Sequence, residues 1–246
     1  MHKLLLLVSA FSLLTSFAHG QQPPSALPPS PPPFRGEAEA GAILVSGASS
    51  SESYAGKLSM AYTQDKNIYS GAGAYIRSEA NGIESARNWN LGVRYDRELS
   101  DYFSVFVGQK VESDVYSGYT QRDSTDLGVK YYLIKSDSLN WTVEVGDRYS
   151  KTQPLPGTPQ YANYGRLYSE VNKSWDKNLS VKYWAEYLPN FTDGHAYLFN
   201  TEASLNIMLN SIFSLKLAYL LQYQNAPAGN ADYSTNTTTM NLVAKF

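Results

Sequence analysis

The sequence predicts an all-β protein, a transmembrane antiparallel up-and-down β-barrel of about twelve strands behind a signal peptide and a proline-rich spacer. Three observations lead to this prediction. Apolar and polar residues alternate with a period of two along almost the whole chain after Phe34, as in strands with two different faces. Short and long connections alternate between these segments, as in outer-membrane barrels. The 20 Tyr, 9 Phe and 4 Trp residues gather near strand ends, where a barrel meets the bilayer surfaces.

Residues 1–20 have the pattern of a secretory signal peptide. A basic residue, Lys3, precedes an apolar run over 4–14, and small residues follow at Ser16, Ala18 and Gly20. The apolar run is shorter than the roughly 18 residues of a membrane helix. We therefore expect export, with the mature chain starting near Gln21.

Residues 21–35 form a proline-rich segment, QQPPSALPPSPPPFR. Proline is excluded from helix interiors and central strands, so an extended spacer is predicted here. A ligand for a proline-binding module is the alternative. The barrel itself is expected over residues 36–246.

Twelve segments are long enough to cross a bilayer as tilted strands. They are 36–46, 53–64, 67–78, 86–96, 102–114, 121–134, 141–151, 163–174, 178–188, 196–208, 212–224 and 235–246. An even number of strands brings both chain termini to one side, which is the periplasmic side if the short turns lie there. Residues 79–85 and 153–162 are among the predicted long loops.

Each segment has one apolar face and one polar face. In 141–151, Trp141, Val143 and Val145 alternate with Thr142, Glu144 and Gly146. A soluble sandwich would also alternate, but it has no reason to place aromatic residues in two belts. The belt at the turn ends comprises Tyr62, Tyr95, Phe103, Tyr131, Trp141, Trp175 and Phe213. The belt at the loop ends comprises Tyr54, Trp89, Tyr149, Tyr187, Tyr197 and Tyr223. These belts favour a barrel in a membrane.

The chain ends in MNLVAKF, an alternating segment that runs to the last residue. Chain ends are usually frayed unless they are tied down. The segment is predicted to be the last strand, closing the barrel on the first. A strand that ends in a C-terminal aromatic resembles the sorting signal of outer-membrane proteins, so Phe246 is the candidate assembly signal.

The polar faces carry charges of both signs, which predicts a lumen lined by ion pairs. The candidate residues are Arg94, Lys110, Glu112, Asp114, Arg122, Asp126, Lys130, Glu144, Arg148, Arg166, Glu170, Lys182, Glu186, Glu202 and Lys216. Residues opposite one another in antiparallel strands interact directly. The predicted opposite pairs are Asp126–Arg148, Lys130–Glu144, Arg166–Glu186, Glu170–Lys182, Lys110–Asp126, Asp114–Arg122 and Glu202–Lys216. Mixed charge favours a narrow or closed interior, and the alternative is solvated charges in a wide pore.

The stretch from Tyr102 to Tyr149 resembles the YdiY-type salt-induced outer-membrane protein family, a domain of unknown function. The residues that carry the resemblance are Glu112, Asp114, Tyr116, Tyr119, Arg122, Gly128, Glu144 and Gly146. The chain departs from the family pattern by having Gly128 alone in place of Gly-x-Gly, and Gly47-Ala48 in place of Gly-Asn. The resemblance implies an outer-membrane barrel and brings no established activity.

Enzymatic and metal chemistry find little support. After the signal segment the only histidine is His195, and no serine at its depth is a convincing nucleophile partner. One histidine and no cysteine make a transition-metal site improbable, and no cofactor is expected. The net charge of -2, with no basic stripe, argues against nucleic-acid binding.

The expected protein is a monomer without enzymatic activity, located in the outer membrane. Its expected partners are outer-membrane lipid, lipopolysaccharide and, during insertion, the barrel-assembly machinery. Three functions stay open: a structural barrel with an ion-paired lumen and a role in envelope or osmotic stress, a narrow porin-like channel for ions or small solutes, and a surface-interaction protein acting through its loops.

Overall fold

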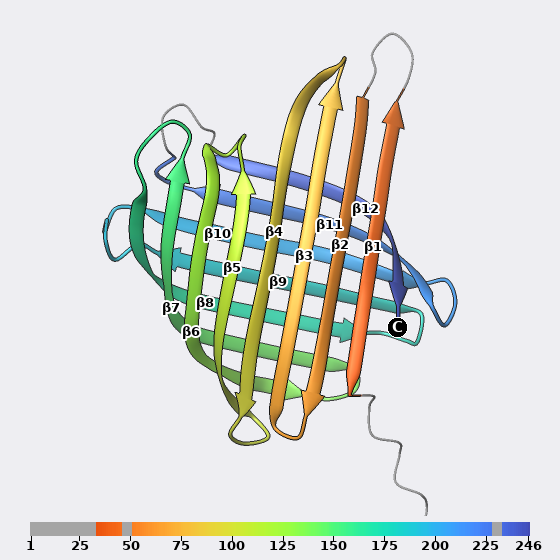
Figure 1. Ribbon diagram of the computed structural model, residues 1–246. Helices are drawn as coiled ribbons and strands as arrows, with labels where there is room; N and C mark the ends of the chain where they lie inside the picture. Colours follow the sequence, from red (N-terminus) through yellow and green to blue (C-terminus); the bar gives the residue numbers. More distant parts are fainter. Residues whose placement is uncertain (1–32, 46–50, 228–232) are drawn as a thin grey trace, which may run out of the picture. The chain divides into compact units, whose positions relative to one another are not determined.

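The computed structural model describes residues 33–45, 51–227 and 233–246, and within them the chain forms a closed antiparallel barrel (Figure 1). Each strand pairs with its neighbours in the chain, and the first strand closes the barrel on the last. The predicted fold class is confirmed. The predicted signal peptide and most of the predicted spacer, residues 1–32, lie outside the described residues. No helix in the described part of the chain is long and apolar enough to span a membrane.

Twelve strands make up the barrel in the described residues. They are β1 (Phe34–Val45), β2 (Ser51–Gln64), β3 (Asn67–Ala80), β4 (Ile83–Glu98), β5 (Phe103–Asp114), β6 (Tyr119–Lys135), β7 (Leu139–Pro154), β8 (Gln160–Ser174), β9 (Leu179–Pro189), β10 (Tyr197–Met208), β11 (Phe213–Gln224) and β12 (Ser234–Lys245). Several strands extend further at their loop ends than the sequence predicted.

The predicted long loop over 79–85 is wrong. β3 and β4 are joined by a two-residue turn, Asn81–Gly82, with φ of 51° and 77°. Left-handed backbone at both positions is the geometry of a tight hairpin turn, and Asn-Gly is the pair that adopts it most readily. The residues on either side therefore continue the strands.

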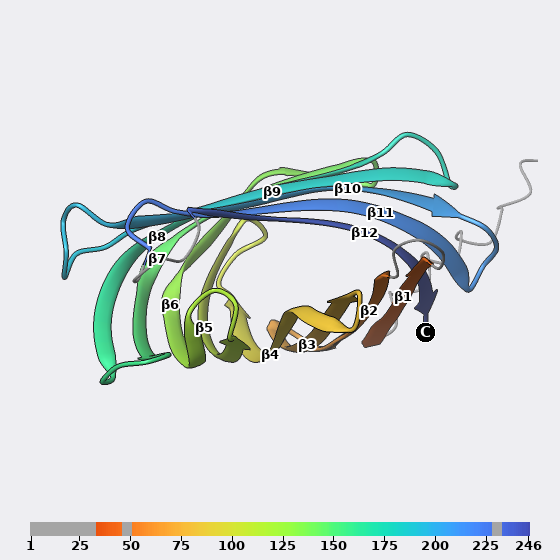
Figure 2. The same ribbon diagram turned by 90° about the horizontal axis from the view of Figure 1, so that it is seen from above.

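Two walls of the barrel face each other across the lumen. In Figure 1, β1–β5 run nearly upright in front, and the strands from β8 to β12 cross behind them at a steep angle. Figure 2 shows these front and back walls joined through β6 and β7 on one side and through β1 and β12 on the other. The closing contact is short, because β1 pairs with β12 over four residue pairs and with β2 over twelve.

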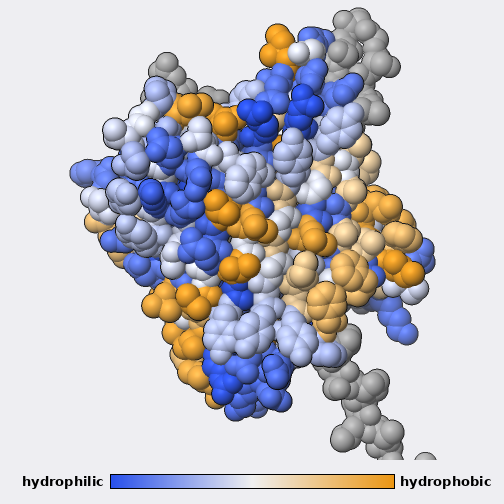
Figure 3. All heavy atoms as spheres, viewed as in Figure 1, coloured by the Kyte–Doolittle hydropathy of each residue, from blue (hydrophilic) through white to orange (hydrophobic). Residues whose placement is uncertain are grey.

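The barrel is polar inside and apolar outside. Among the described residues, thirteen buried side chains are polar or charged, whereas five buried residues are apolar or aromatic. Large exposed apolar residues, such as Leu91, Val93 and Leu127, lie on the outer face. Figure 3 shows apolar residues across the middle of the front wall, with polar residues above and below them. A soluble sandwich would bury its apolar faces, so this arrangement fits a barrel of the membrane type.

Aromatic residues pack against one another at both ends of the outer face. At the turn end, where the chain passes from β2 to β3, the ring centroids of Tyr69 and Tyr95 lie 5.2 Å apart. At the loop end, Tyr197 lies 5.5 Å from Tyr187 and 5.8 Å from Tyr223. Aromatic rings therefore contact one another at both ends of the outer face, where the sequence predicts the two belts.

The last residue is held at the turn end. The backbone amide of Phe246 donates to the carbonyl of Gly36 at 3.0 Å, and the amide of Gly36 donates to the carbonyl of Phe246 at 2.7 Å. The rings of Phe34 and Phe246 lie 6.2 Å apart. The terminal strand closes the barrel as predicted, and its apolar residues Met240 and Leu242 are exposed on the outer face.

Candidate functional site: the charged lumen

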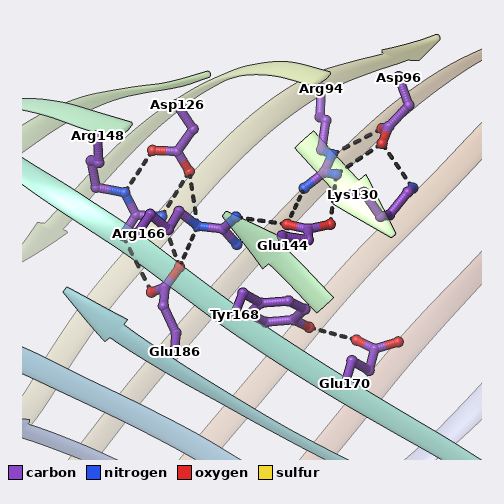
Figure 4. Close-up of polar contacts among 10 residues, drawn as sticks. All are labelled: Arg94, Asp96, Asp126, Lys130, Glu144, Arg148, Arg166, Tyr168, Glu170 and Glu186. Atoms are coloured by element: carbon purple, nitrogen blue, oxygen red, sulfur yellow. Dashed lines mark hydrogen bonds and ion pairs between the residues drawn. The ribbon is translucent and has the colours of Figure 1, made fainter. Parts of the chain in front are cut away.

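Eight charged side chains form one connected cluster in the lumen, here called the central network (Figure 4). They come from β4, β6, β7, β8 and β9 and comprise Arg94, Asp96, Asp126, Lys130, Glu144, Arg148, Arg166 and Glu186. Four are cationic and four are anionic, so the network is neutral. Buried charges are tolerated when they are paired and hydrogen-bonded, and neutrality allows every member a partner.

One half of the network is built around Arg94. Its guanidinium contacts Asp96 at 2.8 Å and Glu144 at 2.7 Å. The ammonium group of Lys130 contacts the same Asp96 at 2.8 Å. Because Arg94 lies on β4 and Glu144 on β7, this pair crosses a corner of the lumen and ties together strands that are not neighbours.

The other half is joined to the first through Arg166. Its guanidinium contacts Glu144 at 2.6 Å and Glu186 at 2.7 Å. Arg148 contacts Asp126 at 2.6 Å and Glu186 at 3.0 Å. Forked guanidinium contacts of this kind fix geometry as well as charge, so the network braces β4 to β9 against one another.

Two glycines let β6 and β7 approach each other closely beside the network. Gly128 lies opposite Gly146, and a Cβ on Gly128 would come within 2.5 Å of the Val145 carbonyl oxygen and 2.8 Å of the Phe106 ring. Phe106 fills the space left by the glycine and is almost fully buried. The Arg94 guanidinium lies 3.8 Å from the centroid of this ring, which gives the half-buried cation a favourable aromatic face.

The predicted register between β6 and β7 is correct. Asp126 lies opposite Arg148, and Lys130 lies opposite Glu144. The first pair is an ion pair at 2.6 Å, whereas the ammonium of Lys130 instead reaches Asp96 on β4. The opposite residue is thus not always the partner of a long side chain.

The predicted register between β8 and β9 is wrong by two residues. Glu186 lies opposite Tyr168, and Glu170 lies opposite Trp184. The predicted ion pairs nevertheless form on the diagonal, Arg166–Glu186 at 2.7 Å and Lys182–Glu170 at 2.8 Å. Flexible side chains span the offset, and Tyr168 adds a hydrogen bond to Glu170 at 2.5 Å.

The predicted register between β5 and β6 is also wrong. Asp126 lies opposite Gly108 rather than Lys110, and Asp114 lies opposite Tyr119 rather than Arg122. Lys110 and Arg122 both form ion pairs with Glu112.

Asp114 accepts hydrogen bonds from the amides of Tyr116 and Ser117, so it fixes the connection over 115–118. The predicted register between β10 and β11 is wrong as well, because Glu202 lies opposite Leu220 rather than Lys216. The Glu202 carboxylate still comes within 3.7 Å of the Lys216 ammonium.

Two buried acidic residues were absent from the predicted set. Asp96 follows Arg94 by two residues, and this spacing puts it on the same inward face of β4, so the strand pattern could have identified it. Glu39 is almost fully buried and contacts Lys216 at 3.1 Å and Asn241 at 3.0 Å. It joins β1 to β11 and β12 where the barrel closes.

The front wall has small side chains on its inner face. This small-residue wall, formed by β2, β3 and β4, comprises Ser59, Ala61, Ser70, Ala72 and Gly92. These residues line a cavity of about 570 Å³, the front cavity, which also touches Arg94 and Lys110. The central network therefore fills one part of the lumen and leaves space beside it.

Two further cavities adjoin the front cavity. The turn-end cavity, about 640 Å³, shares Ser59 and Ala72 with it. The loop-end cavity, about 270 Å³, shares Lys110 with it. Trp184 lines both the turn-end and the loop-end cavities. Cavities at both ends of the lumen thus share lining residues with the front cavity.

The histidine considered for catalysis lies in a connection. His195 follows β9 in the 190–196 segment and is exposed, and its backbone amide donates to Asp193 at 3.2 Å. Within residues 33–45, 51–227 and 233–246, no group of three or more His, Cys, Asp or Glu side chains is arranged to hold a metal ion.

Known proteins resemble this chain in sequence and in fold. Residues 38–246 match the family described as "Protein of unknown function, DUF481". The Escherichia coli (strain K12) protein described as "Uncharacterized protein YdiY" is 25% identical over 226 residues, covering 85% of this chain and 82% of that protein. Among solved structures, the NanC porin superposes with a TM-score of 0.52 at 14% identity, covering 86% of this chain and 97% of the porin. The chain belongs to the DUF481 family, and its barrel is of the outer-membrane type.

Proposed function

We propose that this DUF481 protein is a non-enzymatic outer-membrane barrel that passes ions and small solutes through a narrow lumen. The observation that carries the proposal is the division of the interior between the central network and the small-residue wall. The network occupies the part of the lumen between β4 and β9. Adjoining cavities of about 570 and 640 Å³ run along the opposite part.

The outer face supports a location in the outer membrane. An apolar belt flanked by aromatic residues, around a polar interior, is the surface that a lipid bilayer requires. Export through the predicted signal peptide and recognition of Phe246 by the barrel-assembly machinery would bring the chain there. Lipid and lipopolysaccharide would surround a monomer, with both chain termini on the periplasmic side.

The central network supports a narrow passage over a wide one. A wide diffusion pore keeps a water-filled lumen, whereas here cation–anion contacts join strands that are not neighbours, from β4 to β7 and from β7 to β9. The space left over is bordered by small side chains. Pore diameter and the groups that line it decide which solutes pass, so only small ones are expected here.

Conductance of the purified protein in a planar bilayer tests the proposal. Small, stable single-channel steps are expected. A structural barrel with a role in envelope or osmotic stress would give no steps, and a wide pore would give large ones. Either result contradicts the proposal.

A double variant, Arg148→Gln with Arg166→Gln, sharpens the same experiment. It removes two cations that brace the network, so the lumen should loosen and the steps should become larger. Heat-modifiable migration of the variant on gels verifies that the barrel has formed.

A further inference from the structure

Three lysines of the lumen are more accessible than the carboxylates with which they pair. The Lys57 side chain is 41% exposed and that of its partner Glu39 is 5% exposed. The same comparison gives 44% for Lys110 against 16% for Glu112. It gives 37% for Lys182 against 20% for Glu170. In each pair the lysine side chain therefore offers more accessible surface to the water of the lumen than the acidic side chain does.

These three lysines are distributed along the adjoining cavities. Lys110 lines both the loop-end cavity and the front cavity, so it stands where the two meet. Lys57 on β2 and Lys182 on β9 both line the turn-end cavity, from the front wall and the back wall. A solute crossing the lumen through these spaces passes all three.

The remaining lumen pairs differ much less in exposure. The Asp126 side chain is 20% exposed against 15% for Arg148, and that of Glu202 is 15% exposed against 11% for Lys216, so the acidic side chain is only slightly more accessible in these pairs. The central network is neutral, and the Arg94 side chain at its edge is more exposed than those of its partners Asp96 and Glu144. Glu37 is the exposed acidic residue of the turn-end cavity, and its partner Lys245 is equally exposed. Arg35, which is exposed, adds a further cation at this end.

We propose that the lumen selects for anions, through the accessible ammonium groups of Lys57, Lys110 and Lys182. This inference rests on the proposed function. The solutes are small anions, inorganic ones and compact carboxylates or phosphates. Fixed charges act on a mobile ion over about 10 Å at 0.1 M salt and about 3 Å at 1 M, so the preference weakens as salt increases. Basic side chains lining a pore are a recognised source of anion selectivity.

Substitution of the lysines should leave the barrel intact, because each carboxylate keeps another partner. Glu39 retains Lys216 and Asn241. Glu112 retains Arg122, and Glu170 retains the hydroxyl of Tyr168. A change in selectivity can therefore be separated from a loss of folding.

The test is the reversal potential of the full-length barrel in a planar bilayer under a potassium chloride gradient. For the unchanged protein, the permeability of chloride should exceed that of potassium. The triple variant Lys57→Gln, Lys110→Gln and Lys182→Gln should lower the chloride-to-potassium ratio by at least about twofold, because the field of the pore changes sign or vanishes. The single variant Lys110→Gln should lower it in part.

A matched control removes the same charge outside the lumen. Lys66 and Lys177 lie in the connections after β2 and β8, and Lys151 is exposed on the outer face of β7. Replacing all three by Gln should leave the ratio unchanged. If the unchanged protein conducts with a chloride-to-potassium ratio at or below one, or if both triple variants shift this ratio equally, the inference of anion selectivity fails. The proposed passage of small solutes is not contradicted by that result. If the folded protein does not conduct at all, the proposed function fails as well.

Discussion

The two parts of the lumen differ in what their side chains do. Between β4 and β9, long charged residues meet in the central network and brace strands that are not neighbours. Along β2, β3 and β4, Ser59, Ser70 and Ala72 reach no further than the wall and leave the front cavity open. The same alternating strand pattern thus gives one part of the lumen that is filled and one that is open. The size of the inward-facing side chains decides between the two.

The sharpest contrast between the two parts should be in stability. Glu144→Gln removes the anion that lies between Arg94 and Arg166 and leaves a net positive charge in the buried network. Removing one partner of a buried ion pair costs about 3–5 kcal/mol. Urea unfolding in lipid vesicles measures this loss. Ser59→Ala on the small-residue wall is the control and should cost less than about 0.5 kcal/mol.

A second contrast separates the two faces of the small-residue wall. Arg at the exposed outer residue Leu91 would lie in the apolar belt and cost about 2–4 kcal/mol. Arg at the neighbouring Asn90, which lines the front cavity, would reach water and should cost far less. Equal losses in the same unfolding assay would show that the assigned faces, or the cavity, are wrong.

The closing strand should matter for assembly more than for stability. Phe246→Asp keeps the backbone bonds between residues 36 and 246, so the folded barrel should lose less than about 1 kcal/mol. The amount of heat-modifiable protein in the cell envelope should fall sharply, because the candidate sorting signal is removed. Normal amounts of inserted protein would refute the role of Phe246.

The strands and their faces were predictable because a period of two is visible in one segment at a time. Register was less predictable, because shifts of two residues keep every side chain on the same face. For this reason the β6–β7 register was correct, whereas the β8–β9 register was wrong and its ion pairs formed diagonally. Local face patterns contain no information that separates such registers.

The missing members of the site have specific physical reasons. Glu39 bonds to Lys216, 177 positions further along the chain, so only the closure of the barrel brings the two together. The division between a filled and an open part of the lumen depends on how the front and back walls cross. No single strand shows this crossing, although the small residues of β2 to β4 were visible in the sequence.

The central claim, that solutes pass along the small-residue wall, is tested most directly by filling that wall. Ala72 faces the front and turn-end cavities, whereas Ala40 is exposed on the outer face of β1. Single-channel conductance of Ala72→Trp should fall by more than about half, because the indole occupies the passage, and Ala40→Trp should conduct like the unchanged protein. Equal conductance of Ala72→Trp and the unchanged protein, with both barrels folded, would contradict the claim.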